Sequence, residues 1–218
     1  MEGNKAVGTE ASTKSLTIGG GLAGIISIVS YITIVFTSLS NQLTFLLAMF
    51  FPIFGIVFLF SVKEYINYQL ETYASNLGFV FGSLAFTICA IFLSAQIAVQ
   101  SEMDFTKIPA DDALKTIKES IRLIDMGMDV AWDMFIGTYL ILFLIATLRI
   151  KKLKVWGLVM GTMGFVLIVL NVMTFPIPPA DAKLFDLGPF IALMLLGLAF
   201  WILMLGLRMK SGEEKSGT

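Results

Sequence analysis

Six runs of apolar residues constrain this chain more than any other feature of its sequence. An α-helix needs about 20 apolar residues to cross a hydrocarbon core roughly 30 Å thick. Runs of this length predict six transmembrane helices, over residues 16–39, 43–62, 77–99, 128–148, 155–174 and 187–207. Residues 1–15 and 209–218 are polar, and we expect them to be tails on either side of a membrane domain at 16–208.

The composition agrees with a membrane domain. Hydrophobic residues make up 57% of the 218 residues and charged residues only 14%, whereas a soluble domain has roughly 25% charged residues. The predicted fold class is therefore all-α: a polytopic membrane helical bundle, with the lipid bilayer as its surroundings. The net charge of −1 gives no reason to expect a nucleic-acid partner.

The residue types that are missing exclude several chemistries. The sequence has no histidine, and its single cysteine, Cys89, lies inside an apolar run. Histidine-ligated haem, Ser-His catalysis, an intrachain disulfide and a cysteine-rich metal site are therefore excluded. Acids alone could act on lipids, but no nucleophile–base pair is visible. We expect no cofactor, no dedicated metal site and no enzymatic activity.

The distribution of lysine and arginine predicts the orientation in the membrane. With the N-terminus inside, the inner segments hold ten of these residues and the outer segments hold five. The turn "RIKKLK" at residues 149–154 contributes most to this difference. Because basic residues concentrate on the cytoplasmic side of membrane proteins, we expect both termini in the cytoplasm.

The longest outer connection, residues 100–127, contains the sequence "IPADDALKTIKESIRLID". Its apolar residues recur at helical spacing with charged residues between them, which predicts an amphipathic helix. Asp111 or Asp112 can cap the start of this helix just after Pro109. It would lie on the outer membrane surface or the mouth of the bundle, or run directly into the fourth span with Gly127 as its weak point.

Three of the predicted spans carry a G-x-x-x-G motif near their start. The pairs are Gly20 and Gly24, Gly78 and Gly82, and Gly157 and Gly161. Small residues four positions apart allow helix backbones to approach closely within a membrane. All three pairs belong to odd-numbered spans, so we expect tight packing at the cytoplasmic end. In the alternative, these glycines only fill loose or lipid-facing positions.

Three aspartates lie four residues apart at the entrance to the fourth span. They are Asp125, Asp129 and Asp133, and Asp133 would lie roughly 6 Å deeper than Asp129 along a helix. A carboxylate at that depth costs on the order of 1–3 kcal/mol, so it should face a partner or a wet cavity. In the alternative, a helix starting near residue 125 would stabilise these acids through its N-terminal dipole.

Other polar residues fall at the same predicted outer ends of the spans. These residues are Gln96, Asn171 and Asp186. Arg122 lies one turn before Asp125 and is expected to reach the upper acids. For Asp133 the possible partners are Gln96, Asn171, the hydroxyl of Tyr139 or a bound cation. Together these residues predict an outward-opening acidic vestibule that holds a small solute or cation.

The segment "TFPIPPADAKLFDLGPF", residues 174–190, joins the last two spans. Its prolines favour a stiff, extended path, so it is either a lid over the vestibule or simply a rigid loop. Trp132 and Trp156 fall where interfacial aromatic residues are expected. Trp201 falls deeper, where a packing role is expected.

Two stretches of the sequence also resemble a known class of proteins. "MGMDVAWDMFIG" and "LNVMTFPIPPADAKLFDLGP" resemble uncharacterised six-helix membrane proteins of bacteria and archaea, over about residues 120–207. The resemblance implies the six-span fold and a prokaryotic inner membrane. It implies no activity and assigns no functional residue.

Two hypotheses for function follow. In the first, the protein binds or moves a small solute or cation through the acidic vestibule, without enzymatic activity. In the second, it is a structural or accessory subunit of a larger membrane complex, and its polar residues only fix helix packing or contact a membrane-protein partner.

Overall fold

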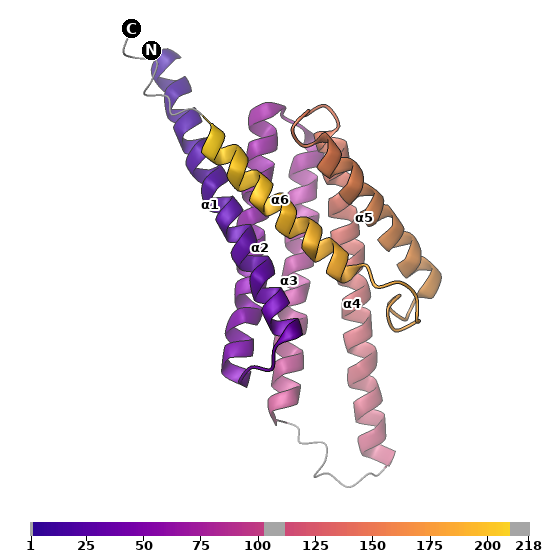
Figure 1. The fold of residues 1–218 in the computed structure, drawn as a ribbon. Helices are drawn as coiled ribbons and strands as arrows, with labels where there is room; N and C mark the ends of the chain where they lie inside the picture. The colour runs from indigo at the N-terminus through magenta and orange to yellow at the C-terminus, as the bar shows by residue number, and fades with distance from the viewer. Residues whose placement is uncertain (1, 103–111, 210–218) are drawn as a thin grey trace.

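The computed structural model describes residues 2–102 and 112–209, and every regular element of secondary structure in this part is an α-helix. The helices, shown in Figure 1, are α1 (Glu2–Phe36), α2 (Asn41–Gln69), α3 (Tyr73–Glu102), α4 (Asp112–Thr147), α5 (Lys154–Thr174) and α6 (Gly188–Arg208). All six are long and apolar enough to cross a membrane. The structure therefore confirms the all-α class and the six predicted transmembrane helices.

The helices cover the predicted spans, but most of them are longer. Residues 2–15, predicted as a polar tail, are helical and form the first part of α1. This segment contains no proline, and its alanine, lysine and glutamate residues have high helix propensity. Of the predicted tail at 209–218, only Met209 lies within the described residues.

The amphipathic helix of the outer connection and the fourth span are one continuous helix, α4. Of the two arrangements expected for this segment, the helix that runs directly into the membrane is the one observed. Gly127 does not interrupt it, since a single glycine costs a long helix only about 1 kcal/mol. Asp112 is the first residue of α4, whereas Pro109 and Asp111 lie outside the described residues.

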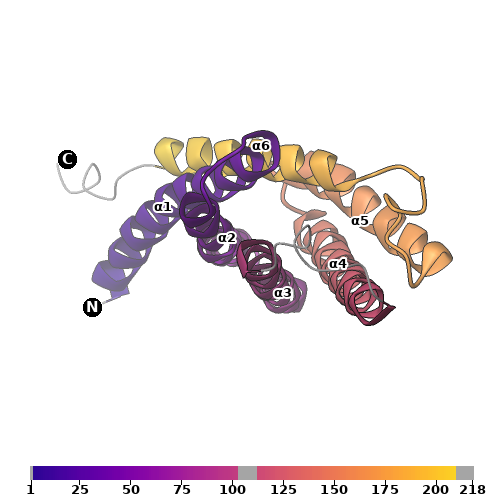
Figure 2. The same ribbon diagram turned by 90° about the horizontal axis from the view of Figure 1, so that it is seen from below.

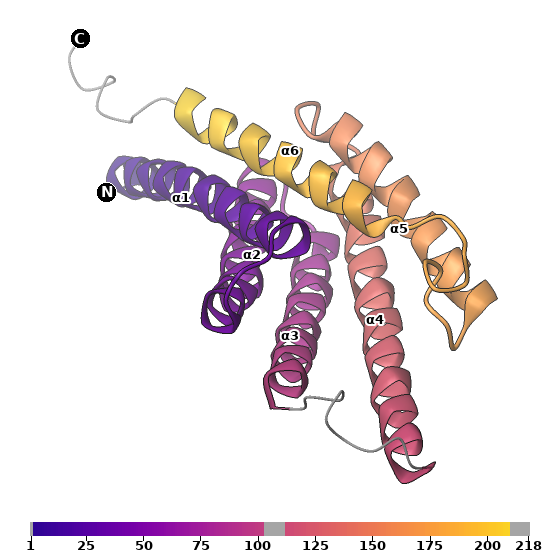
Figure 3. The ribbon, with the colours of Figure 1, turned by 60° about the horizontal axis from the view of Figure 1, so that its bottom comes forward.

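The six helices form two layers. Figures 2 and 3 show α2, α3 and α4 side by side in one layer, with α1, α6 and α5 crossing them in the other. The closest neighbours along this arrangement are α1 with α2 and α6, and α4 with α3 and α5. The start of α1 and the end of α6 lie at the same end of the molecule (Figure 1), here termed the terminal end.

Glycines lie where the helices approach most closely near the terminal end. A methyl group added at Gly24 would come within 2.7 Å of Phe58 in α2 and Ala199 in α6. Similar overlaps would arise at Gly20, Gly82, Gly157 and Gly161. Only at Gly78 would the added methyl make an ordinary contact, 3.5 Å from Leu142. Helix packing at this end therefore depends on side chains no larger than hydrogen.

Candidate functional site

Asp133 is a buried carboxylate in the middle of α4. Its side chain is only 7% exposed, and its Oδ2 accepts a hydrogen bond of 2.8 Å from Nδ2 of Asn171 in α5. The same Nδ2 also donates to the carbonyl oxygen of Leu167, at 3.0 Å. Asn171 is itself 1% exposed, and its Oδ1 is buried without a hydrogen-bond partner among the described residues. The pair is a polar connection between two membrane helices.

A close crossing of α4 and α5 brings these two residues together. A methyl group at Gly164 would lie 2.6 Å from the carbonyl oxygen of Gly137, so neither position has room for a larger side chain. Asp133 lies about one turn from Gly137, and Asn171 about two turns from Gly164, toward the same end of the antiparallel pair. The close approach of α4 and α5 at these glycines therefore brings the carboxylate of Asp133 within hydrogen-bonding distance of the amide of Asn171.

A cavity of about 150 Å³ lies beside Asp133, at the end of the molecule opposite the terminal end; we name it the acidic cavity. Its wall is formed by Tyr31, Asp129, Trp132, Asp133, Leu167, Pro178, Pro179, Ala180, Asp186, Leu187 and Gly188. The wall thus contains three carboxylates and two aromatic side chains, and no lysine or arginine is among the described residues that line it. Such a site attracts positive charge.

The loop between α5 and α6 closes one side of the acidic cavity. Turn hydrogen bonds hold it, from the amides of Ala182 and Leu184 to the carbonyl oxygens of Pro178 and Pro179, at 3.0 and 2.9 Å. Asp186 Oδ1 accepts the backbone N–H of Gly188 at 2.9 Å, where α6 begins. Asp186 is exposed, so the cavity reaches the molecular surface beside this loop.

The structure separates Asp125 and Gln96 from the acidic cavity. Both line a different cavity of about 340 Å³, between α3 and α4, together with Ala95, Val99, Ile121 and Ile124. The expected single vestibule with all three aspartates is therefore wrong. Each four-residue step advances about 40° around a helix, so Asp125 and Asp133 differ in direction by about 80°.

Arg122 does not pair with any of the three aspartates Asp125, Asp129 and Asp133. Its guanidinium pairs with Glu119 at 3.1 Å, and both side chains are exposed. The expectation that Arg122 reaches Asp125 or Asp129 is therefore wrong. Its guanidinium binds Glu119, one turn earlier in α4, instead. Asp129 has no hydrogen-bond partner among the described residues.

The alternative explanation of the aspartates by a helix N-terminus is also wrong. α4 begins at Asp112, so Asp125, Asp129 and Asp133 lie several turns inside the helix. The dipole effect is confined to the first turn. Any stabilisation of these three carboxylates must therefore come from neighbouring groups in the bundle and not from a helix N-terminus.

Three other aromatic residues singled out in the sequence also have defined surroundings in the structure. The Tyr139 hydroxyl, a possible partner of Asp133, is buried without a hydrogen bond, and its ring packs near Phe143. Trp132, expected near the membrane interface, lines the acidic cavity. Trp201, for which a packing role was expected, does pack against the hydrophobic core. Its indole nitrogen also donates to the carbonyl oxygen of Lys152 at 2.9 Å, which ties α6 to the turn between α4 and α5.

Tyr31 is a part of the site that the sequence did not reveal, whereas residues Pro178 to Ala180 belong to the segment expected to be a lid or a rigid loop. Tyr31 is the one tyrosine in the first span, and that is a weak signal, because a tyrosine near a membrane interface is common. Among the described residues, no group of three or more His, Cys, Asp or Glu is placed to hold a metal ion.

The architecture defines the class of protein. The chain is a multi-pass helical membrane protein, because it has six helices long and apolar enough to cross a membrane. A buried carboxylate–amide pair and an acidic cavity lie between these helices. No protein-family model, no curated protein and no solved structure matches the chain. The resemblance to uncharacterised six-helix membrane proteins therefore remains a prediction.

Proposed function

We propose that the protein binds a small cation or cationic solute in the acidic cavity, and that its role is not enzymatic. The main support is Asp133, which lines the cavity, is almost fully buried, and has only one of its two oxygens hydrogen-bonded by a described residue. Ionisable groups within membrane helices are costly and commonly mark the paths of ions or substrates. A bound cation would stabilise Asp133 and Asp129 together.

The proposed direction of access follows from the two ends of the bundle. At the terminal end the helices pack against glycines, whereas the acidic cavity lies toward the other end. With the termini in the cytoplasm of a prokaryotic cell, as the basic residues predict, the cavity would face the outside of the inner membrane. Binding then needs no change at the closed end, and transport would require those glycine contacts to separate.

Thermal unfolding of the detergent-purified protein tests the proposal. Small cations at constant ionic strength should raise the melting temperature of the native protein. Asp133→Asn should remove this rise while the variant still folds, and Asp125→Asn, on the same helix but outside the acidic cavity, should keep it. Equal responses of the native protein and Asp133→Asn to every cation would refute the proposal.

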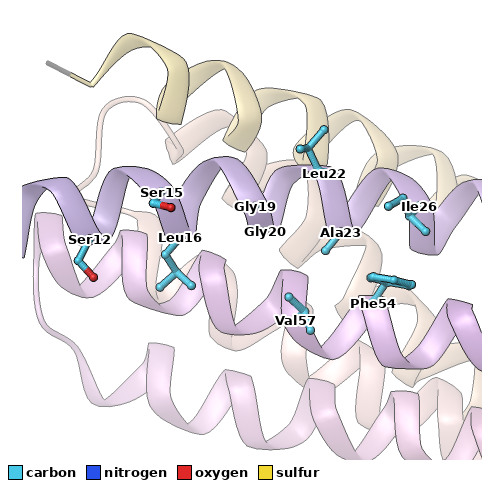
Figure 4. A pocket seen from close by; sticks show the side chains of 10 residues that line it. All are labelled: Ser12, Ser15, Leu16, Gly19, Gly20, Leu22, Ala23, Ile26, Phe54 and Val57. Atoms are coloured by element: carbon cyan, nitrogen blue, oxygen red, sulfur yellow. The ribbon is translucent and has the colours of Figure 1, made fainter. Parts of the chain in front are cut away.

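A second candidate function, that of an accessory subunit, is favoured by a groove on the outside of α1 and α2. Figure 4 shows this groove, which has a volume of about 620 Å³ and is lined by Ser12, Ser15, Leu16, Gly19, Gly20, Leu22, Ala23, Ile26, Phe54 and Val57. Ser15, Gly19 and Ala23 follow one another at four-residue spacing, which is the pattern of close helix–helix contacts in membranes. A methyl group at Gly19 would meet nothing within 4 Å.

Co-purification after mild detergent extraction tests the accessory role. The groove should hold a transmembrane helix of a stoichiometric partner, and a photo-crosslinking residue at Ser15 should join the two chains. Gly19→Phe would fill the groove and should abolish the cross-link, whereas Val172→Phe, at an exposed position on α5, should not. A cross-link that survives Gly19→Phe would argue against docking in this groove.

A further inference from the structure

The turn between α4 and α5 concentrates positive charge at the terminal end of the bundle (Figure 1). We term residues 149–154 the basic turn. Its basic residues are Arg149, Lys151, Lys152 and Lys154. All four are exposed, and none of them forms an ion pair with a described residue. Residues 134–180 contain no aspartate or glutamate, so neighbouring parts of the chain do not neutralise this charge.

The backbone of the basic turn is held in place, which keeps its charges together. Ile150 and Leu153 are buried and belong to the hydrophobic core. The amides of Leu153 and Lys154 both donate to the carbonyl oxygen of Ile150, at 2.9 Å. From α6, Nε1 of Trp201 donates to the carbonyl oxygen of Lys152. The basic side chains therefore start from a backbone that the core and α6 both fix.

Lys63, near the same end of the bundle in α2, shows how a cation is satisfied within this protein. Its Nζ lies 2.7 Å from Oε1 of Glu64. The same Nζ lies over the rings of Phe60 and Phe79, at 4.8 and 5.5 Å from their centroids. The basic turn has no comparable partner among the described residues, so an anion that satisfies its charges must come from outside the described chain.

Exposed apolar side chains flank the basic turn on both helices. Val155, in the first turn of α5, is 71% exposed, and Leu148, next to the end of α4, is 44% exposed. Ile145, Leu158 and Val159 are exposed further along the two helices. Because α4 and α5 are membrane helices, these side chains face lipid tails, and the basic turn between the helix ends lies at the level of the lipid headgroups.

We infer that the basic turn binds the headgroup of an anionic phospholipid, whose acyl chains lie along the exposed apolar residues of α4 and α5. Lysine and arginine donate charge-assisted hydrogen bonds to phosphate oxygens, and basic residues beside membrane helices attract anionic lipids. A zwitterionic lipid carries its own cation, which four neighbouring positive charges repel. A soluble anion would leave the apolar residues without a partner. The inference goes beyond the proposed function, because it involves neither the acidic cavity nor the groove on α1 and α2.

Native mass spectrometry of the detergent-purified full chain tests the inference with two lipids, dioleoyl phosphatidylglycerol and dioleoyl phosphatidylcholine. They have the same acyl chains and differ in the net charge of the headgroup. Phosphatidylglycerol should bind at least about tenfold more tightly, and high salt should reduce this difference. Glycerol phosphate, which has an anionic head but no acyl chains, should not displace the bound lipid.

Matched variants assign the binding to the basic turn. Lys151→Gln combined with Lys152→Gln should weaken phosphatidylglycerol binding at least about tenfold, since each basic residue near an anionic lipid contributes about fivefold. Lys151→Arg combined with Lys152→Arg keeps the charge and should keep the binding. Lys115→Gln combined with Lys183→Gln removes the same charge from exposed positions toward the other end, and should leave the binding unchanged. Thermal unfolding shows whether each variant is folded.

Three results would contradict the inference. Equal binding of the two lipids would overturn it, and so would undiminished phosphatidylglycerol binding by Lys151→Gln combined with Lys152→Gln. Displacement of the lipid by glycerol phosphate would identify a site for a soluble anion instead. None of these results bears on cation binding, because no residue of the basic turn is among those that line the acidic cavity.

Discussion

The two ends of the bundle use opposite kinds of residue for the same task of joining helices. At the terminal end, glycines such as Gly20 and Gly24 let the backbones of α1, α2 and α6 meet without intervening side chains. Toward the other end, α4 and α5 are joined through the polar pair of Asp133 and Asn171, beside an open volume. Close contacts at glycines join the helices at one end, whereas a buried carboxylate at the other end requires polar partners and lies beside a cavity.

A small residue and a charged residue constrain membrane helices differently. A glycine contact is dispersion packing, which is lost when any atom is added. A buried carboxylate is an electrostatic cost that its surroundings only partly offset. Substitutions that add volume should therefore destabilise the close glycine contacts, whereas at the pair of Asp133 and Asn171 the largest loss is expected when the charge stays in place without its partner.

The largest effect on stability is expected for Gly20→Ala. The added methyl would overlap the side chain of Ser61, whose hydroxyl donates to the carbonyl oxygen of Leu16 at 2.9 Å. Overpacking of this kind costs about 1–3 kcal/mol. The matched control is Gly19→Ala, because nothing lies within 4 Å of that position; it should be neutral or stabilising. Chemical denaturation in detergent measures both, and equal effects would break the distinction.

A loss of similar size is expected when the partner of the buried charge is removed. Asn171→Leu would leave Asp133 without its hydrogen bond of 2.8 Å, which costs about 1–3 kcal/mol. The double variant Asp133→Asn with Asn171→Leu removes the charge as well and should recover part of that loss. Denaturation of the single and double variants measures the recovery, and strict additivity would show that the pair is not coupled.

The loop that closes the acidic cavity should respond more weakly. Asp186→Ala removes the side-chain acceptor for the backbone N–H of Gly188 at the start of α6. Loss of a single hydrogen bond of this kind costs about 0.5–1.5 kcal/mol. Hydrogen exchange of the Gly188 amide should accelerate in this variant, whereas that of amides in the middle of α6 should stay as in the native protein.

The smallest effect is expected at the exposed pair of Arg122 and Glu119. Both side chains are exposed and their contact is a surface ion pair, which contributes little to stability. Arg122→Gln should leave both the unfolding transition and cation binding unchanged. A loss of cation binding in this variant would show that Arg122 influences Asp129 or Asp133. The exposed ion pair and the buried carboxylate would then not be independent.

The sequence by itself determined the class of fold. Six apolar runs long enough to cross hydrocarbon leave little freedom, because a helix of each run satisfies its own backbone where water is absent. The glycine pairs near the starts of three predicted spans were also visible in the sequence. For Asp133 the sequence predicted a partner or a wet cavity, with stabilisation by a helix N-terminus as the alternative. These properties are local to single helices.

Only the tertiary structure decided which polar residues share a site. Asp125, Asp129 and Asp133 are equivalent in spacing, yet the first lies in a different cavity, because the three directions diverge around α4. Tyr31 and Asp186 are 155 positions apart in the chain, and they meet only because α1, α4 and the loop before α6 come together. The sequence determines on which face of its helix each residue lies. What that face contacts depends on how the helices cross, and close contacts such as that of Gly137 with Gly164 fix the crossing.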